Sequence, residues 1–228
     1  ERSPAQPELS KKAQLERKRL SVKNGLFISF EGIDGVGKST QLDLLVQFLA
    51  EQGQTVCRTL EPGGTDLGRE IRELLLHRKG EVAPRAEALL FAADRAHHVA
   101  TVIRPALERG EVVVTDRYLD SSVAYQGSGR ELGFDQVRDL SLFAVDGLLP
   151  QLTVLLDLDA NKAAARRSNT GAEPDRLERA KIEFFEAARQ AYLKMAADEP
   201  ARFLVLDAEQ SVESMQQQIR ERVQGLLG

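Results

Sequence analysis

The chain has 228 residues and a formal net charge of −4, and 42% of its residues are hydrophobic and 29% charged. These proportions are typical of a globular protein, and a mildly acidic chain without tryptophan is a poor candidate for a dedicated DNA-binding protein. No apolar run approaches the roughly 20 residues of a membrane span. The single cysteine, Cys57, excludes an internal disulfide and favours the reducing cytoplasm.

The first 24 residues differ from the rest in charge, because they carry a net charge of +4 and the remainder a net charge of −8. We expect a flexible basic arm over residues 1–24 and one domain over 25–228. Such an arm could contact nucleic acid or a membrane, but one short basic run is more often a solvated extension. The sequence therefore predicts neither a nucleic-acid nor a membrane partner.

From residue 25 on, short apolar runs alternate with segments of helical period. Strands are expected at Leu26–Phe30, Thr55–Leu60, Glu111–Thr115, Leu152–Leu158 and Phe203–Leu206. Helices are expected at Lys38–Glu51, Leu67–Leu76, Arg85–Leu107 with an interruption at Pro105, Phe134–Val145, Asn161–Arg167, Arg176–Ala197 and Val212–Leu227. This alternation predicts an α/β fold with a five-stranded parallel sheet covered by helices on both faces.

The segment Gly32–Ser39 matches G-x-x-x-x-G-K-[ST], the Walker A phosphate loop, between a predicted strand and a predicted helix. Glycines let backbone N–H groups wrap a phosphate chain, and the helix N-terminus attracts the same anion. Lys38 is expected to reach the β- and γ-phosphates of ATP, and the Ser39 hydroxyl to hold Mg²⁺. The expected nucleotide-binding residues are Gly32, Ile33, Asp34, Gly35, Val36, Gly37, Lys38, Ser39 and Thr40.

Asp116 closes a predicted strand, where the Walker B acid of such proteins holds or orients the metal. The alternative is an aspartate that caps a turn, but next to a phosphate loop the metal role is favoured. A guanine-binding Asn-Lys-x-Asp motif is missing, since Asn161-Lys162 is followed by two alanines. This argues against a GTPase switch.

Other residues indicate a second, anionic substrate. Phe91 and Arg95 lie four residues apart on one helix face, so that a ring and a guanidinium could stack on and pair with a nucleobase. Arg72 follows the turn that begins at Glu61-Pro62, and Gln126 could read a base edge. In isolation these are equally well a core phenylalanine, surface arginines and a loop glutamine.

The polar segment between Arg166 and Arg176 resembles a lid that brings arginines onto the transferring phosphate, although an ordinary interhelical loop would look the same. His97-His98 could suggest a metal, but adjacent helical residues point about 100° apart. Surface exposure or dimer packing is the favoured interpretation. Cys57 lies in a predicted buried strand and is expected to pack rather than react.

Together these residues resemble the thymidylate kinase family of the bacterial kind, over roughly residues 25–228. The segments that carry the resemblance are Phe30–Thr40, Glu61–Thr65, Leu90–Arg95, Asp116–Tyr118, Tyr125–Gly127 and Asp175–Glu178. The resemblance implies a nucleoside-monophosphate-kinase fold, a homodimer, and phosphorylation of dTMP to dTDP by Mg-ATP. It further implies that Lys38, Asp116, Arg117, Arg166 and Arg167 serve catalysis.

The resemblance also assigns the acceptor site. It implies that Asp34 contacts the sugar 3′-hydroxyl, that Phe91 stacks on thymine and that Arg95 and Gln126 bond its edge. Tyr125 would crowd the 2′ position, while Arg72 and Arg117 would hold the acceptor phosphate. The remaining expected substrate contacts are Glu61, Pro62 and Ser122.

Two features concern variation within that family. Members carry the catalytic arginine either inside the phosphate loop or in the lid, and here position 35 is glycine and the lid holds Arg166 and Arg167, which resembles the lid-arginine type over about residues 166–177. Leu60 stands where the family usually has arginine, so any phosphate contact of that arginine is absent or replaced. Another nucleoside-monophosphate kinase, or a weak nucleotide-binding protein that uses its arm on nucleic acid, are the alternatives.

Overall fold

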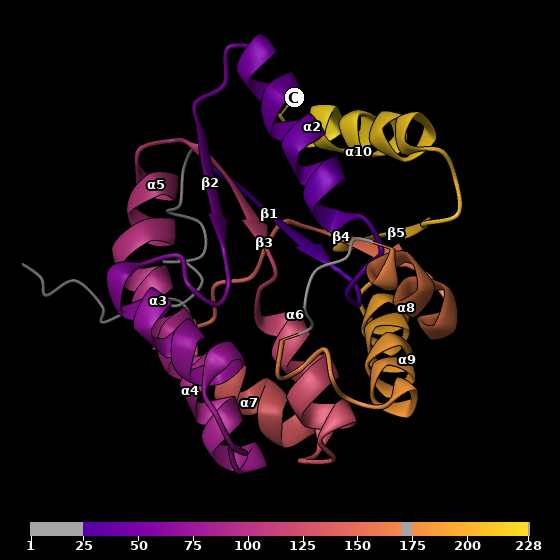
Figure 1. Ribbon diagram of the computed structural model, residues 1–228. Helices are drawn as coiled ribbons and strands as arrows, with labels where there is room; N and C mark the ends of the chain where they lie inside the picture. Colours follow the sequence, from indigo (N-terminus) through magenta and orange to yellow (C-terminus); the bar gives the residue numbers. More distant parts are fainter. Residues whose placement is uncertain (1–24, 170–174, 228) are drawn as a thin grey trace, which may run out of the picture.

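Five parallel strands in the order β2-β3-β1-β4-β5 form the sheet of the computed structural model, which describes residues 25–169 and 175–227 (Figure 1). The strands are β1 (Leu26–Glu31), β2 (Val56–Leu60), β3 (Val112–Asp116), β4 (Leu152–Asp157) and β5 (Phe203–Asp207). Every residue of the central strand β1 is buried, as expected of a parallel strand covered on both faces. The predicted sheet is confirmed, with strand bounds that differ by at most one residue.

Helices follow the strands and cover the sheet (Figure 1). They are α2 (Lys38–Glu51), α3 (Asp66–Arg72), α4 (Pro84–His98), α5 (Arg104–Glu108), α6 (Leu119–Ser122), α7 (Phe134–Ala144), α8 (Ala160–Ser168), α9 (Ile182–Asp198) and α10 (Val212–Leu227), with π-helical turns η1 (Glu73–His77), η2 (Val99–Ile103) and η3 (Val123–Gly129). The predicted interruption at Pro105 is confirmed, because η2 precedes α5, in which Pro105 is near the first turn. Proline lacks the N–H that a continuous helix needs there.

One local prediction is wrong. The helix expected from Arg176 begins only at Ile182, because the Asp175 carboxylate accepts the backbone N–H groups of Leu177 and Glu178 and closes a turn instead. Of the two interpretations of Gln126, the ordinary loop glutamine is excluded, because Gln126 lies in η3 and is buried. Residues 1–24 and 170–174 lie outside the described residues, and so do the predicted arm and the middle of the predicted lid.

The sheet places its chemistry at one edge. The loops after β1 and β3 both leave the carboxyl ends of adjacent parallel strands, which pair in register from Leu26 with Val112 to Phe30 with Asp116. Ligands of open parallel sheets bind at this edge. Within residues 25–169 and 175–227, none of the helices has the length and apolar character needed to span a membrane.

Candidate active site

The phosphate loop folds around close backbone contacts. Gly32 and Gly35 have φ values of +130° and +90°, and a Cβ atom on either would lie 2.5 Å from a carbonyl oxygen, of Leu156 and Ala163 respectively. Only glycine fits both the conformation and the space. The side chains of Ile33 and Val36 are buried in the core, so only their backbone can face a ligand.

Lys38 is buried in the first turn of α2, and its Nζ donates to the carbonyl oxygens of Gly32 (3.0 Å) and Ile33 (3.1 Å). Burial, and then the nearby Arg117 guanidinium, lower the pKa of Lys38. A phosphate that entered this loop would place negative charge beside Lys38 and Arg117. The loop is thus built to take up an anion.

Ser39 and Asp116 meet across the loop, where the Ser39 hydroxyl donates to Asp116 Oδ2 at 3.3 Å. The other oxygen of Asp116, Oδ1, is buried without a hydrogen-bond partner among the described residues. A buried, unpartnered carboxylate oxygen beside a hydroxyl suits a hard cation such as Mg²⁺. No described group of three or more His, Cys, Asp or Glu side chains could hold a metal.

The cavity beside this loop, the phosphate cavity, is lined by Lys38, Ser39, Asp116 and Arg117. Leu60 also lines it and is 37% exposed. The arginines that line the same cavity are Arg72, Arg117, Arg166 and Arg167. Four guanidinium groups therefore line the cavity to which position 60 contributes a leucine.

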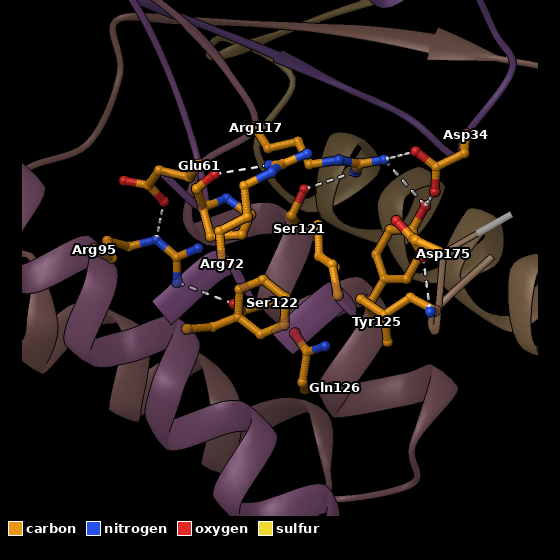
Figure 2. A pocket seen from close by; sticks show the side chains of 14 residues that line it. Asp34, Glu61, Arg72, Arg95, Arg117, Ser121, Ser122, Tyr125, Gln126 and Asp175 are labelled. Carbon is orange, nitrogen blue, oxygen red and sulfur yellow. Dashed lines mark hydrogen bonds and ion pairs between the residues drawn. The ribbon is translucent and has the colours of Figure 1, made fainter. Parts of the chain in front are cut away.

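A second cavity, the nucleoside cavity, adjoins the first, because the two share lining residues. Figure 2 shows the side chains that line it. All ten residues predicted to contact the acceptor line it: Asp34, Glu61, Pro62, Arg72, Phe91, Arg95, Arg117, Ser122, Tyr125 and Gln126. They come from five separate segments of the chain. The structure therefore brings the predicted acceptor-binding residues together in one cavity.

Arg95 is almost fully buried in the wall of this cavity. Its Nε donates to Glu61 Oε2 at 2.6 Å, its Nη1 to the Ser122 hydroxyl at 3.0 Å and its Nη2 to the carbonyl of Tyr118 at 3.1 Å. Burial opposes its charge, but the Glu61 carboxylate outweighs this and raises the pKa of Arg95. Arg95 is therefore a fixed cation, and the alternative of a surface arginine is wrong.

His98 is fully buried, which corrects the expectation of surface exposure or dimer packing. Its Nδ1 lies 2.9 Å from Glu61 Oε1, and its Nε2 lies 2.6 Å from the Thr59 hydroxyl. Glu61 thus joins His98 to Arg95 with its two oxygens. The histidine supports the carboxylate that holds Arg95.

Arg117 stands at the boundary of the two cavities with φ +70°, in the left-handed region that side chains rarely adopt. Its Nη2 donates to Asp34 Oδ1 at 2.5 Å and to the Tyr125 hydroxyl at 3.3 Å, and its Nη1 to the Gly32 carbonyl at 3.2 Å. The Tyr125 hydroxyl donates to Asp34 Oδ2 at 3.1 Å (Figure 2). This closed triangle fixes all three side chains between the cavities.

Known enzymes have a similar sequence and a similar architecture. A family model described as thymidylate kinase matches residues 30–219. The chain belongs to the thymidylate kinase family. It is 63% identical to the thymidylate kinase of Leifsonia xyli subsp. xyli over 88% of this chain and 95% of that one, and 48% identical to that of Halothermothrix orenii over 89% and 98%. The crystal structure of thymidylate kinase from Ehrlichia chaffeensis aligns with a TM-score of 0.73 at 30% identity, over 88% of this chain and 99% of that chain.

This membership confirms the predicted fold and reaction. The chain is a nucleoside-monophosphate kinase that phosphorylates dTMP to dTDP. The GTPase and nucleic-acid-binding alternatives therefore fall away as its main function. What the site residues contribute has to be argued from their geometry.

The two arginines of the predicted lid differ in their contacts. Arg166 Nη2 donates to the carbonyl of Ala208 at 3.0 Å, whereas the Arg167 guanidinium lies 4.6 Å from the centre of the Phe185 ring. Both line the phosphate cavity. Asp175, at the far end of the predicted lid, lines the nucleoside cavity.

Three buried carboxyl groups near the site were missed from the sequence. Glu31 accepts the backbone N–H of Tyr118 at 2.7 Å, Asp94 accepts that of Gly63 at 3.2 Å, and Glu87 accepts from Gln126 at 3.1 Å. For Glu87 a signal existed, because it precedes Phe91 by four residues and so shares its helix face. For Glu31 and Asp94 the partners lie too far along the chain to be seen in the sequence.

Proposed function

We propose that the chain transfers the γ-phosphoryl group of Mg-ATP to the phosphate of dTMP across the boundary between its two cavities. One observation carries this proposal: Asp34, Glu61, Arg72 and Arg117 line both cavities. A donor in the phosphate cavity and an acceptor in the nucleoside cavity would therefore meet at these residues. Phosphoryl transfer needs little more than such positioning and charge neutralisation.

On the donor side, the backbone N–H groups of Gly32–Gly37 and the Lys38 ammonium would bind the β- and γ-phosphates of ATP. Ser39 and the unpartnered Oδ1 of Asp116 would hold Mg²⁺, directly or through water. When bound, this ion supplies positive charge to the β- and γ-phosphate oxygens. The residues fit that role because hydroxyl and carboxylate oxygens are the ligands Mg²⁺ prefers.

On the acceptor side, Phe91 would stack on thymine while Arg95 and Gln126 bond its edge, with Ser122 beside them. Asp34 would accept the sugar 3′-hydroxyl. The Tyr125 ring would exclude a 2′-hydroxyl, a role supported by its edge contacts with Phe184, Phe185 and Tyr192, which hold the ring in place. Glu61 and Pro62 position Arg95 and Arg72, since Arg72 donates to the Pro62 carbonyl at 2.8 Å.

In the transfer step, an oxygen of the dTMP phosphate attacks the γ-phosphorus as the bond to the β-phosphate oxygen breaks, which yields dTDP and ADP. Arg72 and Arg117 would hold the acceptor phosphate in line. Arg166 or Arg167 would neutralise charge on the moving group, an effect worth roughly 10³–10⁵ in rate in related phosphoryl transfers. Closure over both substrates would exclude water, whose attack would waste ATP.

The chain is also proposed to act as a homodimer. Helices α3 and α7 both pack against α4, and exposed apolar side chains lie on these helices (Leu67, Leu89 and Phe143) and on the adjoining turn η1 (Leu74). Phe143 is 85% exposed, which is unusual for an unpartnered phenylalanine. Light scattering of wild type and of Phe143→Asp tests the dimer, and a wild-type monomer would refute it. The cytoplasmic location stays a prediction.

The test of the reaction measures ADP release with Mg-ATP against dTMP, dUMP, dCMP, AMP and the ribose form of TMP. Turnover that is strongest with dTMP, weaker with dUMP and small with the ribose form supports the base and sugar assignments together. Preference for another acceptor would leave a kinase but refute the assigned pocket. Bound ATP with no acceptor-dependent turnover would refute the assigned transfer step.

A further inference from the structure

Glu87 is a buried carboxylate in the first turn of α4 that joins three parts of the nucleoside cavity. Its Oε1 accepts from Gln126 Nε2 at 3.1 Å and from Arg130 Nε at 3.2 Å. Its Oε2 accepts from Arg176 Nη2 at 2.6 Å and from Arg130 Nη2 at 3.4 Å. The side chain itself is fully shielded from solvent and does not line the cavity.

The guanidinium groups of Arg130 and Arg176 both donate to Glu87, and a carboxylate offers them and Gln126 only acceptor oxygens. The amide of Gln126 has a donor end and an acceptor end, and it could face the cavity with either. The Glu87 carboxylate lies behind this amide and accepts a hydrogen bond from its nitrogen. The carbonyl oxygen of Gln126 is then the end left for the substrate.

We propose that Glu87 is a positioning residue that makes the enzyme select thymine over cytosine by fixing the direction of the Gln126 amide. This inference rests on the proposed function. Thymine presents an N3–H donor beside a C4 carbonyl, whereas cytosine presents an unprotonated N3 beside an amino group. A carbonyl at Gln126 can accept from the N3–H of thymine, whereas against the unprotonated N3 of cytosine two acceptors would face each other.

Arg95 completes the same selection from the other side. Three of its N–H groups are taken by Glu61, Ser122 and the Tyr118 carbonyl, and the guanidinium has no acceptor atom. Its remaining N–H groups can only donate, which suits the C4 carbonyl of thymine and not the amino group of cytosine. Two buried carboxylates therefore fix the orientation of the side chains proposed to read the base: Glu61 holds Arg95, and Glu87 holds Gln126.

Arg176 offers a matched control because it shares Glu87 without touching Gln126. Its Nε donates to the Leu75 carbonyl at 2.7 Å and its backbone N–H to the Leu76 carbonyl at 3.1 Å. Its loss would disturb the cavity wall at Asp175 and Leu177, yet leave the Glu87–Gln126 contact in place. The Arg176 variant therefore shows the effect of a weakened cavity wall alone, and the Glu87 variant adds the effect of a released Gln126 amide.

The experiment compares kcat/KM for dTMP with that for dCMP in the wild type, Glu87→Gln, Arg176→Gln and the double variant Glu87→Gln/Arg176→Gln. An amide at position 87 can donate as well as accept, so it releases the Gln126 amide. We expect Glu87→Gln to lower the dTMP:dCMP ratio at least about tenfold. The KM for Mg-ATP should change little, and Arg176→Gln should keep the wild-type ratio within about twofold.

The double variant secures the test if Glu87→Gln alone fails to fold, because it removes a buried charge together with a partner. It should show the same loss of selection as Glu87→Gln. Equal losses for dTMP and dCMP, with the ratio unchanged, would overturn the inference and leave Glu87 a purely structural residue. A wild type that does not prefer dTMP would instead overturn the proposed function itself.

Discussion

Arg117 and Asp34 form an ion pair, with Nη2 2.5 Å from Oδ1, at the boundary between the phosphate and nucleoside cavities. Burial opposes the charge of Asp34, but Arg117 and Lys38 outweigh it and lower the pKa of this carboxyl below its ordinary value. Asp34 therefore stays ionised across the working range of pH. In the proposed complex, Asp34 would accept the sugar hydroxyl and hold Arg117 beside the acceptor phosphate.

Arg117→Lys tests whether this guanidinium does more than supply charge. A lysine keeps the charge but cannot bond Asp34, Gly32 and an acceptor phosphate with one rigid fork. We expect kcat to fall roughly 10²–10³-fold, as for loss of one preorganised donor to developing charge. Steady-state kinetics with dTMP and Mg-ATP measures this, with Arg58→Lys on the exposed face as the control. Unchanged kcat would mean that charge alone suffices.

Asp116→Asn tests the metal assignment. The asparagine keeps the shape but removes the charge that Mg²⁺ would share with Ser39. We expect the Mg²⁺ concentration for half-maximal rate to rise about tenfold, equal to about 1.4 kcal/mol of binding. EDTA should abolish turnover of both proteins, and excess Mg²⁺ should restore it. An unaltered Mg²⁺ requirement in the variant would assign Asp116 another role, and Asp43→Asn on an exposed surface provides the control.

Two variants of Tyr125 distinguish the role of its ring from the role of its hydroxyl. Tyr125→Ala should raise kcat/KM for the ribose form of TMP relative to dTMP by about tenfold or more, because the space at the 2′ position opens. Tyr125→Phe keeps the ring but loses the hydrogen bonds to Asp34 and Arg117, so it should slow turnover and keep the preference for deoxyribose. Both ratios come from the same kinetic assay. If Tyr125→Phe alone relaxed the sugar preference, the hydroxyl and not the ring would read the sugar.

The local features of this enzyme could be predicted from the sequence, and the long-range contacts could not. The helix Lys38–Glu51 and all five strands follow from apolar periodicity and from the glycines around them. The start of α9 could not be predicted, because the Asp175 turn competes with a helix that the composition alone favours.

Most of the predicted site residues line the two cavities, because motif spacing carries that information, whereas Gly32, Ile33 and Val36 line neither. The carboxyl groups behind them stayed hidden, since Glu87 meets Gln126 across 39 residues and Glu61 meets His98 across 37. Such pairs form only once the sheet has brought the loops together. His98 illustrates this. The pair His97-His98 in the sequence gives no sign that His98 faces the buried Glu61 carboxylate.

Asp94 provides the last prediction, on the pH dependence of stability. Burial, and then the Glu61 carboxylate, raise the pKa of Asp94 from 3.8 to about 6, while Arg95, His98 and the backbone N–H of Gly63 oppose the shift. Its Oδ2 is buried without a partner among the described residues, so the ionised form is poorly accommodated. The folded protein therefore binds a proton on Asp94 more tightly than the unfolded chain does.

The sign of the effect follows from that difference. The contribution of Asp94 to the free energy of unfolding is present in full below about pH 4 and is lost as pH rises through about 6, by up to about 3 kcal/mol. The asparagine of Asp94→Asn does not titrate. Urea unfolding of the variant and the wild type is measured at pH 4.5, 5.5, 6.5 and 7.5. The difference between their free energies of unfolding isolates the contribution of Asp94, because the other titrating groups cancel. We expect the variant to gain stability relative to the wild type between pH 4.5 and 6.5 and no further above it. A difference that stays constant over this window would show that Asp94 is ionised throughout and that its buried oxygen is satisfied in solution.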